Sequence, residues 1–203
     1  MFIEQIPDIF RSLYPKALWR MDINEKAVYL TFDDGPIPII TPWVVDLLKH
    51  YGIKATFFMV GDNVRKHPKE YAYVVENGHR IGNHTFNHLK GLYTSSNRYI
   101  DNTEQANMLI KSDLFRPPHG MLTYRQYNKL CRDYKLVMWD LVTRDYSSRL
   151  QGDDILANIK RYTRNGSIIT FHDSLKAEHN LKYALPRTIE WLLNEGYCFK
   201  VFE

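Results

Sequence analysis

The chain has 203 residues, of which 44% are apolar and 25% are charged, and its formal net charge is +4. This composition is typical of one globular domain with a sizeable core, and it excludes an intrinsically disordered chain. The basic residues are scattered along the chain instead of forming a run, so the charge does not indicate a nucleic-acid-binding protein.

The first residues, MFIEQIPD, carry an early acid and a proline and lack the apolar run of a signal peptide. No stretch of the chain approaches the roughly 18 apolar residues that a membrane helix needs. The chain as given is therefore expected to be cytoplasmic, and a trimmed secreted or anchored form stays open. Residues 1–25 are expected to form an N-terminal extension, in which the apolar side chains of residues 6–19 pack on the domain and not on a membrane.

Strand-like apolar runs alternate with helix-like segments along the rest of the chain. Strands are expected at residues 28–32, 55–60, 135–141, 167–171 and 198–202, with shorter ones near 80–81 and 114–115. Helices are expected to start at Thr41 as N-cap and Pro42 as first helical residue, and to span residues 69–76, 98–111, 123–134, 153–162 and 183–194. The alternation predicts an α/β fold with a parallel sheet of about seven strands, as an open sheet or a somewhat short barrel.

The first predicted strand ends in two adjacent acids, Asp33 and Asp34, followed by Gly35-Pro36. Parallel α/β folds gather their reacting groups at the carboxyl ends of the strands. Neighbouring side chains of a strand face opposite sides, so the two carboxylates share a site only if the backbone turns beneath them. Two close carboxylates repel unless a cation neutralises one, which predicts one metal ligand and one free base. A plain surface turn is the alternative interpretation.

Two histidines, His84 and His88, lie four residues apart after the third predicted strand. At this spacing two imidazoles can bind a single ion, and Asp34 supplies a third ligand. Three protein ligands leave positions open for water and substrate, which is typical of a catalytic metal site. The alternative is a solvated pair of histidines with no ion.

Three further polar clusters stand where strands are predicted to end. Arg116 precedes two prolines that hold an extended loop. Trp139 lies in a probable strand that leads to a polar turn with Asp145, and His172 follows the strand of residues 167–171. A histidine at the same end of the sheet as Asp33 is a catalytic candidate.

The order of these motifs resembles that of the polysaccharide deacetylase family, the carbohydrate esterases of family four that share the NodB homology domain. The similarity extends from about residue 27 to residue 202 and is carried by the combination of TFDDGP, HTFNH, RPPHG, VTRDY and TFH. The resemblance implies one domain over residues 1–203, a distorted, short (β/α) barrel, and the removal of N- or O-linked acetyl groups from sugars.

The resemblance also implies roles for individual residues. By position, it implies a general base (Asp33), a metal triad (Asp34, His84, His88), an arginine that holds the base (Arg116), a general acid (His172) and a residue that tunes this acid (Asp145). The cofactor is then one divalent ion, for which zinc fits two imidazoles and one carboxylate, with cobalt, nickel or manganese as alternatives.

The chain departs from the family pattern at several positions. His119 stands where the family usually has Tyr, and its expected role is a backbone N–H that donates to an oxyanion. Val142 and Tyr146 replace the first Asp and the Trp of the fourth motif, and Thr170 replaces the Leu that lines the acetyl-methyl pocket. The predicted substrate pocket consists of His119, Trp139, Tyr146 and Thr170. Tyr146 and Thr170 make it more polar, which puts the identity of the acyl group in question.

The leading hypothesis is therefore metal-dependent hydrolysis of the acyl group of an acylated carbohydrate. Two alternatives stay open: a hydrolase of a small non-sugar amide on the same fold, and a sugar-binding protein that has lost catalysis. The sequence leaves the sugar, the chain length, the preference for N- or O-acyl groups and the oligomeric state open.

Overall fold

The computed structural model describes residue 5 and residues 7–203. Within these residues, seven strands follow the spatial order β5-β4-β3-β2-β1-β7-β6, and an eighth strand, β8, pairs with β1. Every pairing between these strands is parallel. The strands are β1 Ala27–Asp33, β2 Thr56–Met59, β3 Arg80–Asn83, β4 Leu114–Phe115, β5 Lys135–Leu136, β6 Leu141–Val142, β7 Ser167–His172 and β8 Cys198–Phe199. The prediction of an α/β fold with a distorted, short barrel is confirmed.

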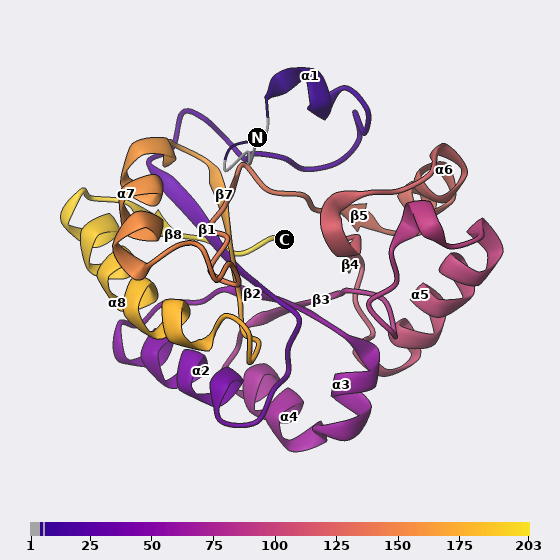
Figure 1. The fold of residues 1–203 in the computed structure, drawn as a ribbon, viewed down its shortest axis with the longest axis horizontal. Helices are drawn as coiled ribbons and strands as arrows, with labels where there is room; N and C mark the ends of the chain where they lie inside the picture. Colours follow the sequence, from indigo (N-terminus) through magenta and orange to yellow (C-terminus); the bar gives the residue numbers. More distant parts are fainter. Residues whose placement is uncertain (1–4, 6) are drawn as a thin grey trace.

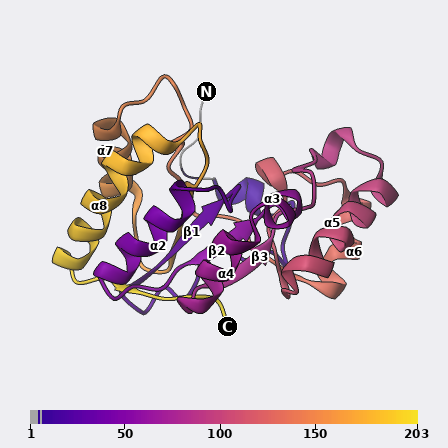
Figure 2. The same cartoon turned by 90° about the horizontal axis from the view of Figure 1, so that it is seen from below.

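The helices surround this curled sheet (Figure 1). They are α1 Asp8–Arg11, α2 Ile40–His50, α3 Gly61–Lys66, α4 Pro68–Glu76, α5 Ser96–Ile110, α6 Tyr124–Asp133, α7 Gly152–Tyr162 and α8 Glu178–Asn194, with short 3₁₀ turns η1 Gly91–Tyr93 and η2 Pro118–Gly120. Figure 2 shows α7 and α8 at one end of the molecule, α5 and α6 at the other, and α2 and α4 between them. In the described part of the chain, no helix combines the length and the apolar character that a membrane crossing requires.

Strand β1 is buried along its whole length and lies inside the sheet, between β2 and β7. Its side chains alternate between two cores because neighbouring residues of a strand face opposite sides. Val28, Leu30 and Phe32 join the core beneath the helices, where Phe32 stacks on Phe57 with the ring centroids 4.9 Å apart. Tyr29 belongs to a separate core inside the barrel. The same strand ends at Asp33, which therefore lies at the carboxyl end of the barrel, here called its rim.

The end of the chain closes the opposite end of the barrel. The predicted strand of residues 198–202 is shorter than expected, because β8 comprises only Cys198–Phe199. The buried Phe202 stacks on Tyr29, at the start of β1, with the ring centroids 5.3 Å apart, and its centroid lies 6.5 Å from that of Phe58. Figure 1 accordingly shows the C-terminus at the centre of the ring of strands. The barrel is filled at its amino end and accessible at its carboxyl end.

The single strand predicted for residues 135–141 is wrong. The segment forms two short strands, of which β5 pairs with β4 and β6 pairs with β7, at opposite ends of the sheet. Between them the backbone bonds to other partners: the N–H of Leu18 donates to the carbonyl of Leu136, and the N–H of Met138 donates to that of Leu18, both at 2.8 Å. The two ends of the sheet are therefore joined through the N-terminal segment.

The described residues before β1 lie across this junction, where Figure 1 shows α1 on the side of the ring between β5 and β7. Gln5 and Arg20 form isolated bridges with Leu141 and Ser167. Arg11 contacts the fully buried Asp140 at 2.6 Å. Tyr14, Ala17 and Trp19 belong to the apolar cluster that also contains residues of α6. Residues 1–4 and 6 of the expected extension lie outside the described residues.

The start of α2 also corrects an expectation. Thr41 is not the N-cap, because α2 begins at Ile40 and the cap position is Ile39, whose φ is 72° and whose side chain makes no capping bond. The hydroxyl of Thr41 instead accepts the N–H of Ile37 at 2.8 Å and donates to Asp173 at 2.5 Å. This threonine therefore stabilises the loop at the carboxyl end of the barrel instead of the start of the helix.

Candidate active site

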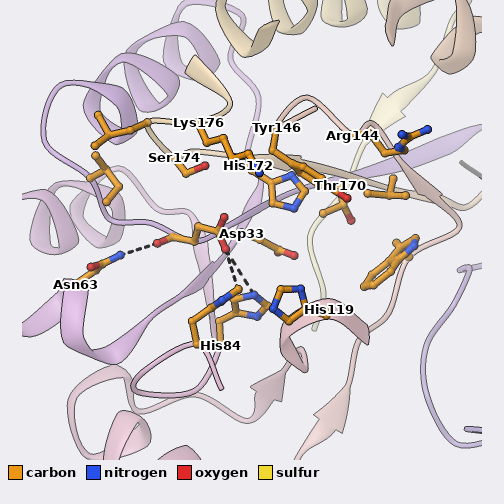
Figure 3. Close-up of a pocket in the computed structure, with 16 residues that line it drawn as sticks. Asp33, Asn63, His84, His119, Arg144, Tyr146, Thr170, His172, Ser174 and Lys176 are labelled. Carbon is orange, nitrogen blue, oxygen red and sulfur yellow. Dashed lines mark hydrogen bonds and ion pairs between the residues drawn. The ribbon is translucent and has the colours of Figure 1, made fainter. Parts of the chain in front are cut away.

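Figure 3 shows a cavity at the carboxyl end of the barrel, with a volume of about 690 Å³. The loops after β1, β3, β4 and β7 contribute to it, together with β6 and the residues on either side of it. The predicted site residues that line it are Asp33, Asp34, His84, His88, His119, Trp139, Tyr146, Thr170 and His172. Arg116 and Asp145, which are fully buried, lie behind this lining.

Asp34, His84 and His88 converge on one point, with their ligand atoms all within 4.8 Å of one another. The Nε2 atoms of His84 and His88 lie 3.8 and 3.2 Å from Oδ1 of Asp34. Nδ1 of His84 donates to the carbonyl of Arg116 at 2.8 Å, which leaves Nε2 as the atom with a free lone pair. This donor set, of two imidazoles and one carboxylate, fits a divalent transition-metal ion.

The electrostatics of this triad suit a cation. Burial lowers the pKa of His84 to about 4, so its imidazole is neutral at neutral pH, as a metal ligand must be. Burial alone raises the pKa of Asp34, but the hydrogen bond from His88 and the charge of His172 outweigh it. The pKa of Asp34 is therefore held well below its ordinary value, and the carboxylate is ionised.

Asp33 is held by a completely buried arginine. Nη1 of Arg116 lies 2.7 Å from Oδ1 of Asp33 and also donates to the hydroxyl of Thr31 at 2.8 Å. The other guanidinium nitrogens donate to the carbonyls of Val137 and Met138, at 3.2 and 2.8 Å. These four bonds satisfy the buried cation, neutralise the carboxylate and fix its direction. They also explain why residues 135–141 do not form one strand.

His172 faces Asp33 across the neighbouring strands β1 and β7. Its Nδ1 lies 2.8 Å from Oδ1 of Asp145, and the other carboxylate oxygen accepts the backbone N–H of His172 at 2.8 Å. Burial alone would lower the pKa of His172, but the charge and the hydrogen bond of Asp145 outweigh it and raise the pKa to about 9. The ring is therefore protonated at neutral pH and presents a proton donor to the cavity through Nε2.

Asp173 is a site residue whose role the sequence reasoning did not identify. It is fully buried, accepts the N–H of Gly35 at 3.1 Å and receives the hydroxyl of Thr41 at 2.5 Å. Its own N–H donates to the carbonyl of Asp33 at 3.1 Å. A Cβ atom at Gly35 would lie 2.1 Å from Asp173, so only glycine fits. Because Gly35 and Asp173 are 138 positions apart, no local pattern reveals this contact.

The rim of the cavity carries strained backbone. Asp34, Thr85, His88, His119 and Arg144 all have positive φ angles, between 54° and 84°. Such angles are uncommon for residues other than glycine and persist only where surrounding bonds enforce them. At Asp34 one such bond comes from Asn63, whose side-chain amide donates to the carbonyl of Asp34 at 2.8 Å. Three of these residues, Asp34, His88 and His119, are among the predicted site residues.

Four residues form the wall beside these groups. The rings of His119 and His88 lie 4.9 Å apart, edge to face. Tyr146 stands edge-on to His172 with the ring centroids 4.7 Å apart, and the hydroxyl of Thr170 lies 3.0 Å from that of Thr31. Trp139 packs so closely on Gly120 that a Cβ there would lie 2.4 Å from the indole. The structure therefore brings together all the residues predicted for the substrate pocket.

A parallel barrel with a candidate metal triad, a carboxylate on a buried arginine and a histidine on a buried carboxylate defines a hydrolase of the α/β-barrel class. A family model for polysaccharide deacetylases matches residues 20–137. A peptidoglycan-N-acetylglucosamine deacetylase of Bacillus cereus is 34% identical over 190 residues, which cover 89% of this chain and 88% of that protein. The chain belongs to the polysaccharide deacetylase family.

Two further similarities agree with this family. A chitooligosaccharide deacetylase of Azorhizobium caulinodans is 29% identical over 162 residues, which cover 76% of this chain and 77% of that protein. The solved structure of a peptidoglycan N-acetylglucosamine deacetylase in complex with 4-naphthalen-1-yl-N-oxidanyl-benzamide matches with a TM-score of 0.85 and 29% identity, over 96% of this chain and 94% of that one. The similarity thus extends over the whole barrel and beyond the matched residues 20–137.

Proposed function

We propose that this protein is a metal-dependent deacetylase that hydrolyses the N-acetyl group of glucosamine units in a glycan. The observation that carries the proposal is the convergence of the triad of Asp34, His84 and His88, with Asp33 and His172 on the same cavity. The names of the relatives, which act on peptidoglycan and on chito-oligosaccharides, support the substrate class.

Asp34, His84 and His88 would hold one divalent ion, for which zinc is the first choice because the set combines two imidazoles with one carboxylate. When bound, such an ion supplies Lewis-acid chemistry: it polarises the substrate carbonyl and lowers the pKa of water. Cobalt, nickel and manganese accept the same ligands, so metal analysis of the purified protein decides between them.

The protein's own residues divide the proton transfers. Asp33 accepts the proton of the attacking water, while Arg116 keeps its carboxylate oriented. His172, protonated at neutral pH, donates the Nε2 proton to the departing amine nitrogen, and Asp145 holds the ring for this transfer. The backbone N–H of His119 is the proposed donor to the carbonyl oxygen as negative charge develops on it.

The test is a comparison of substrates with one protein in two metal states. The protein is stripped with a chelator, reloaded with zinc, and assayed for acetate release from chito-oligosaccharides and peptidoglycan fragments and for ring opening of small cyclic amides. We expect release from the glycans only after reloading. Hydrolysis of the cyclic amides alone would assign the protein to that substrate class, and tight glycan binding without any product would show a sugar-binding protein.

The variant Asp33→Asn tests the base. It keeps the size of the side chain but removes the proton acceptor, so we expect kcat to fall by about 10²–10⁴-fold. Metal content, measured by atomic absorption, is expected to stay unchanged, because the three ligands are untouched. Asp101→Asn, an exposed position on α5, is the matched control and is expected to keep full activity. A near-normal rate in Asp33→Asn would refute the assignment.

A further inference from the structure

The barrel arranges its inward-facing side chains in layers. Asp33 and His172 pair across β1 and β7, and two residues earlier Thr31 pairs with Thr170 on the same face. An acyl carbonyl held between Asp33 and His172 can send only a small group inward, toward Thr170, because Arg116 fills the space behind Thr31. The bulky glycan must leave through the open side of the cavity. The layer of Thr170 is therefore the floor that the end of the acyl group meets.

This floor presents a hydrogen-bond acceptor. The hydroxyl of Thr31 lies 3.1 Å from the carbonyl of Ile169, to which it donates, and it accepts from Arg116 at 2.8 Å. Its proton is then already used, so the hydrogen of the 3.0 Å contact between the two threonines comes from Thr170. The remaining lone pairs of the buried Thr170 hydroxyl are left for a ligand in the cavity.

Tyr146 adds a hydrogen-bond donor on the same side of the cavity. Its ring is half-buried, stands edge-on to His172 and has Lys176 over it, with Nζ 5.6 Å from the ring centroid. Within the described residues its hydroxyl makes no hydrogen bond to the protein, and Figure 3 shows Tyr146 and Thr170 together beside His172. An apolar acyl tail leaves both hydroxyls without a partner from the substrate, which costs binding energy.

We propose that this pocket selects an acyl group that carries a hydroxyl next to the carbonyl, so that the protein removes N-glycolyl groups in preference to purely hydrocarbon acyl groups of the same size. The inference rests on the proposed deacetylase function. The substrate hydroxyl accepts from Tyr146 and donates to Thr170. In the reaction, water adds its oxygen to the acyl carbon, the C–N bond breaks, and the nitrogen gains a proton, so glycolate and a free amino sugar result.

The experiment uses a matched pair of substrates. Chitotetraose carrying N-glycolyl or N-propionyl groups presents acyl groups of nearly equal size that differ by a hydroxyl in place of a methyl group. We expect the zinc-loaded protein to hydrolyse the glycolyl substrate with a kcat/KM about five- to tenfold higher. The released glycolate and propionate are quantified by chromatography, and N-acetyl chitotetraose is assayed in parallel.

Three variants locate the effect. Tyr146→Phe and Thr170→Val each remove one hydroxyl and are expected to bring the glycolyl-to-propionyl ratio close to one, whereas Thr170→Ser keeps the hydroxyl and the preference. The ratio within one variant is insensitive to a general loss of rate. If Thr170→Val does not fold, the ratios of the native protein and of Tyr146→Phe decide.

A glycolyl-to-propionyl ratio of one or less in the native protein would overturn the inference, and so would a ratio that is unchanged in Tyr146→Phe and Thr170→Val. If N-acetyl chitotetraose is hydrolysed in these experiments, the deacetylase function stands. Release of no acid from any of the three substrates by the zinc-loaded protein would overturn the deacetylase function itself, and the inference with it.

Discussion

At the scale of single residues, each buried catalytic candidate has one dedicated partner of opposite charge. Asp33 contacts Arg116 at 2.7 Å, and His172 contacts Asp145 at 2.8 Å. Burial without a partner would favour the neutral form of His172, and Asp145 raises the pKa of this ring so that it is charged inside the cavity. The pair of Asp33 and Arg116 would supply a proton acceptor, and the pair of His172 and Asp145 would supply a proton donor.

The pair of His172 and Asp145 predicts a change in pH dependence. Below a pKa of about 9 His172 is protonated and able to donate, so activity is lost as pH rises through that value. In Asp145→Asn the carboxylate charge is gone, and the alkaline limb of the profile of kcat/KM against pH is expected to move toward or below the ordinary histidine value of about 6.5. Asp153→Asn, exposed on α7, serves as the control. An alkaline limb at the same pH in both variants would contradict the role of Asp145.

At the scale of elements, the site depends on how three elements hold one turn. Strand β1 ends at Asp33, and the next residue, Asp34, turns with a φ of 84°. Asp173, directly after β7, and Thr41, in the first turn of α2, hold this turn through Gly35. The hydroxyl of Thr41 is used for this contact, and the cap position of α2 is Ile39, which makes no side-chain capping bond.

The variant Asp173→Ala is expected to weaken this turn. It leaves the N–H of Gly35 and the hydroxyl of Thr41 buried without their partner, which costs about 1–3 kcal/mol in the free energy of unfolding. Because Asp34 loses its support, zinc affinity, measured by titration of the metal-free protein, is expected to fall at least about tenfold. Asp173→Asn keeps an acceptor for Gly35 and is expected to retain most of this affinity. Equal zinc affinity in Asp173→Ala and the native protein would show that the turn holds without Asp173.

At the scale of the whole molecule, one end of the barrel is filled and the other is accessible. The C-terminal segment places Phe202 inside the barrel, where it stacks on Tyr29 near the start of β1 and its ring centroid lies 6.5 Å from that of Phe58. Through its backbone bonds, Leu18 of the N-terminal segment joins β5 to Met138, in the stretch that leads to β6. The segments around Leu18 and Phe202 therefore complete the barrel, while the cavity at the carboxyl ends stays available to a substrate.

Truncation of the Phe202 side chain tests whether this residue fills one end of the barrel without affecting the cavity at the other. Phe202 is 3% exposed, so Phe202→Ala is expected to lower the free energy of unfolding by about 3–5 kcal/mol, measured by urea denaturation. Met108→Ala removes an apolar side chain that is 74% exposed and is expected to change it by less than about 0.5 kcal/mol. The folded Phe202→Ala protein is expected to keep its zinc affinity, since the triad lies at the other end. If Phe202→Ala lowered the free energy of unfolding no more than Met108→Ala does, Phe202 would not be part of the core.

The sequence by itself determined the class of fold and the composition of the rim. The alternation of strands and helices is a local pattern, and the acids and histidines at strand ends need only the parallel arrangement to meet. Thr31 was accessible to the same reasoning, because it lies two residues before Asp33 and so faces the same side of β1. The named motifs therefore contain every residue of the candidate metal triad and of the pairs Asp33–Arg116 and His172–Asp145.

Only the tertiary structure decided how these residues are held. The division of residues 135–141 into two strands, the diversion of Thr41 from its cap and the bond from Gly35 to Asp173 each depend on a partner far away in the sequence. A propensity or a motif describes what a segment favours alone, whereas a buried polar group takes whichever partner the completed fold brings within reach. For that reason the candidate groups of this rim and their partners Arg116 and Asp145 were readable from the chain, and the contacts that hold the turn at Gly35 were not.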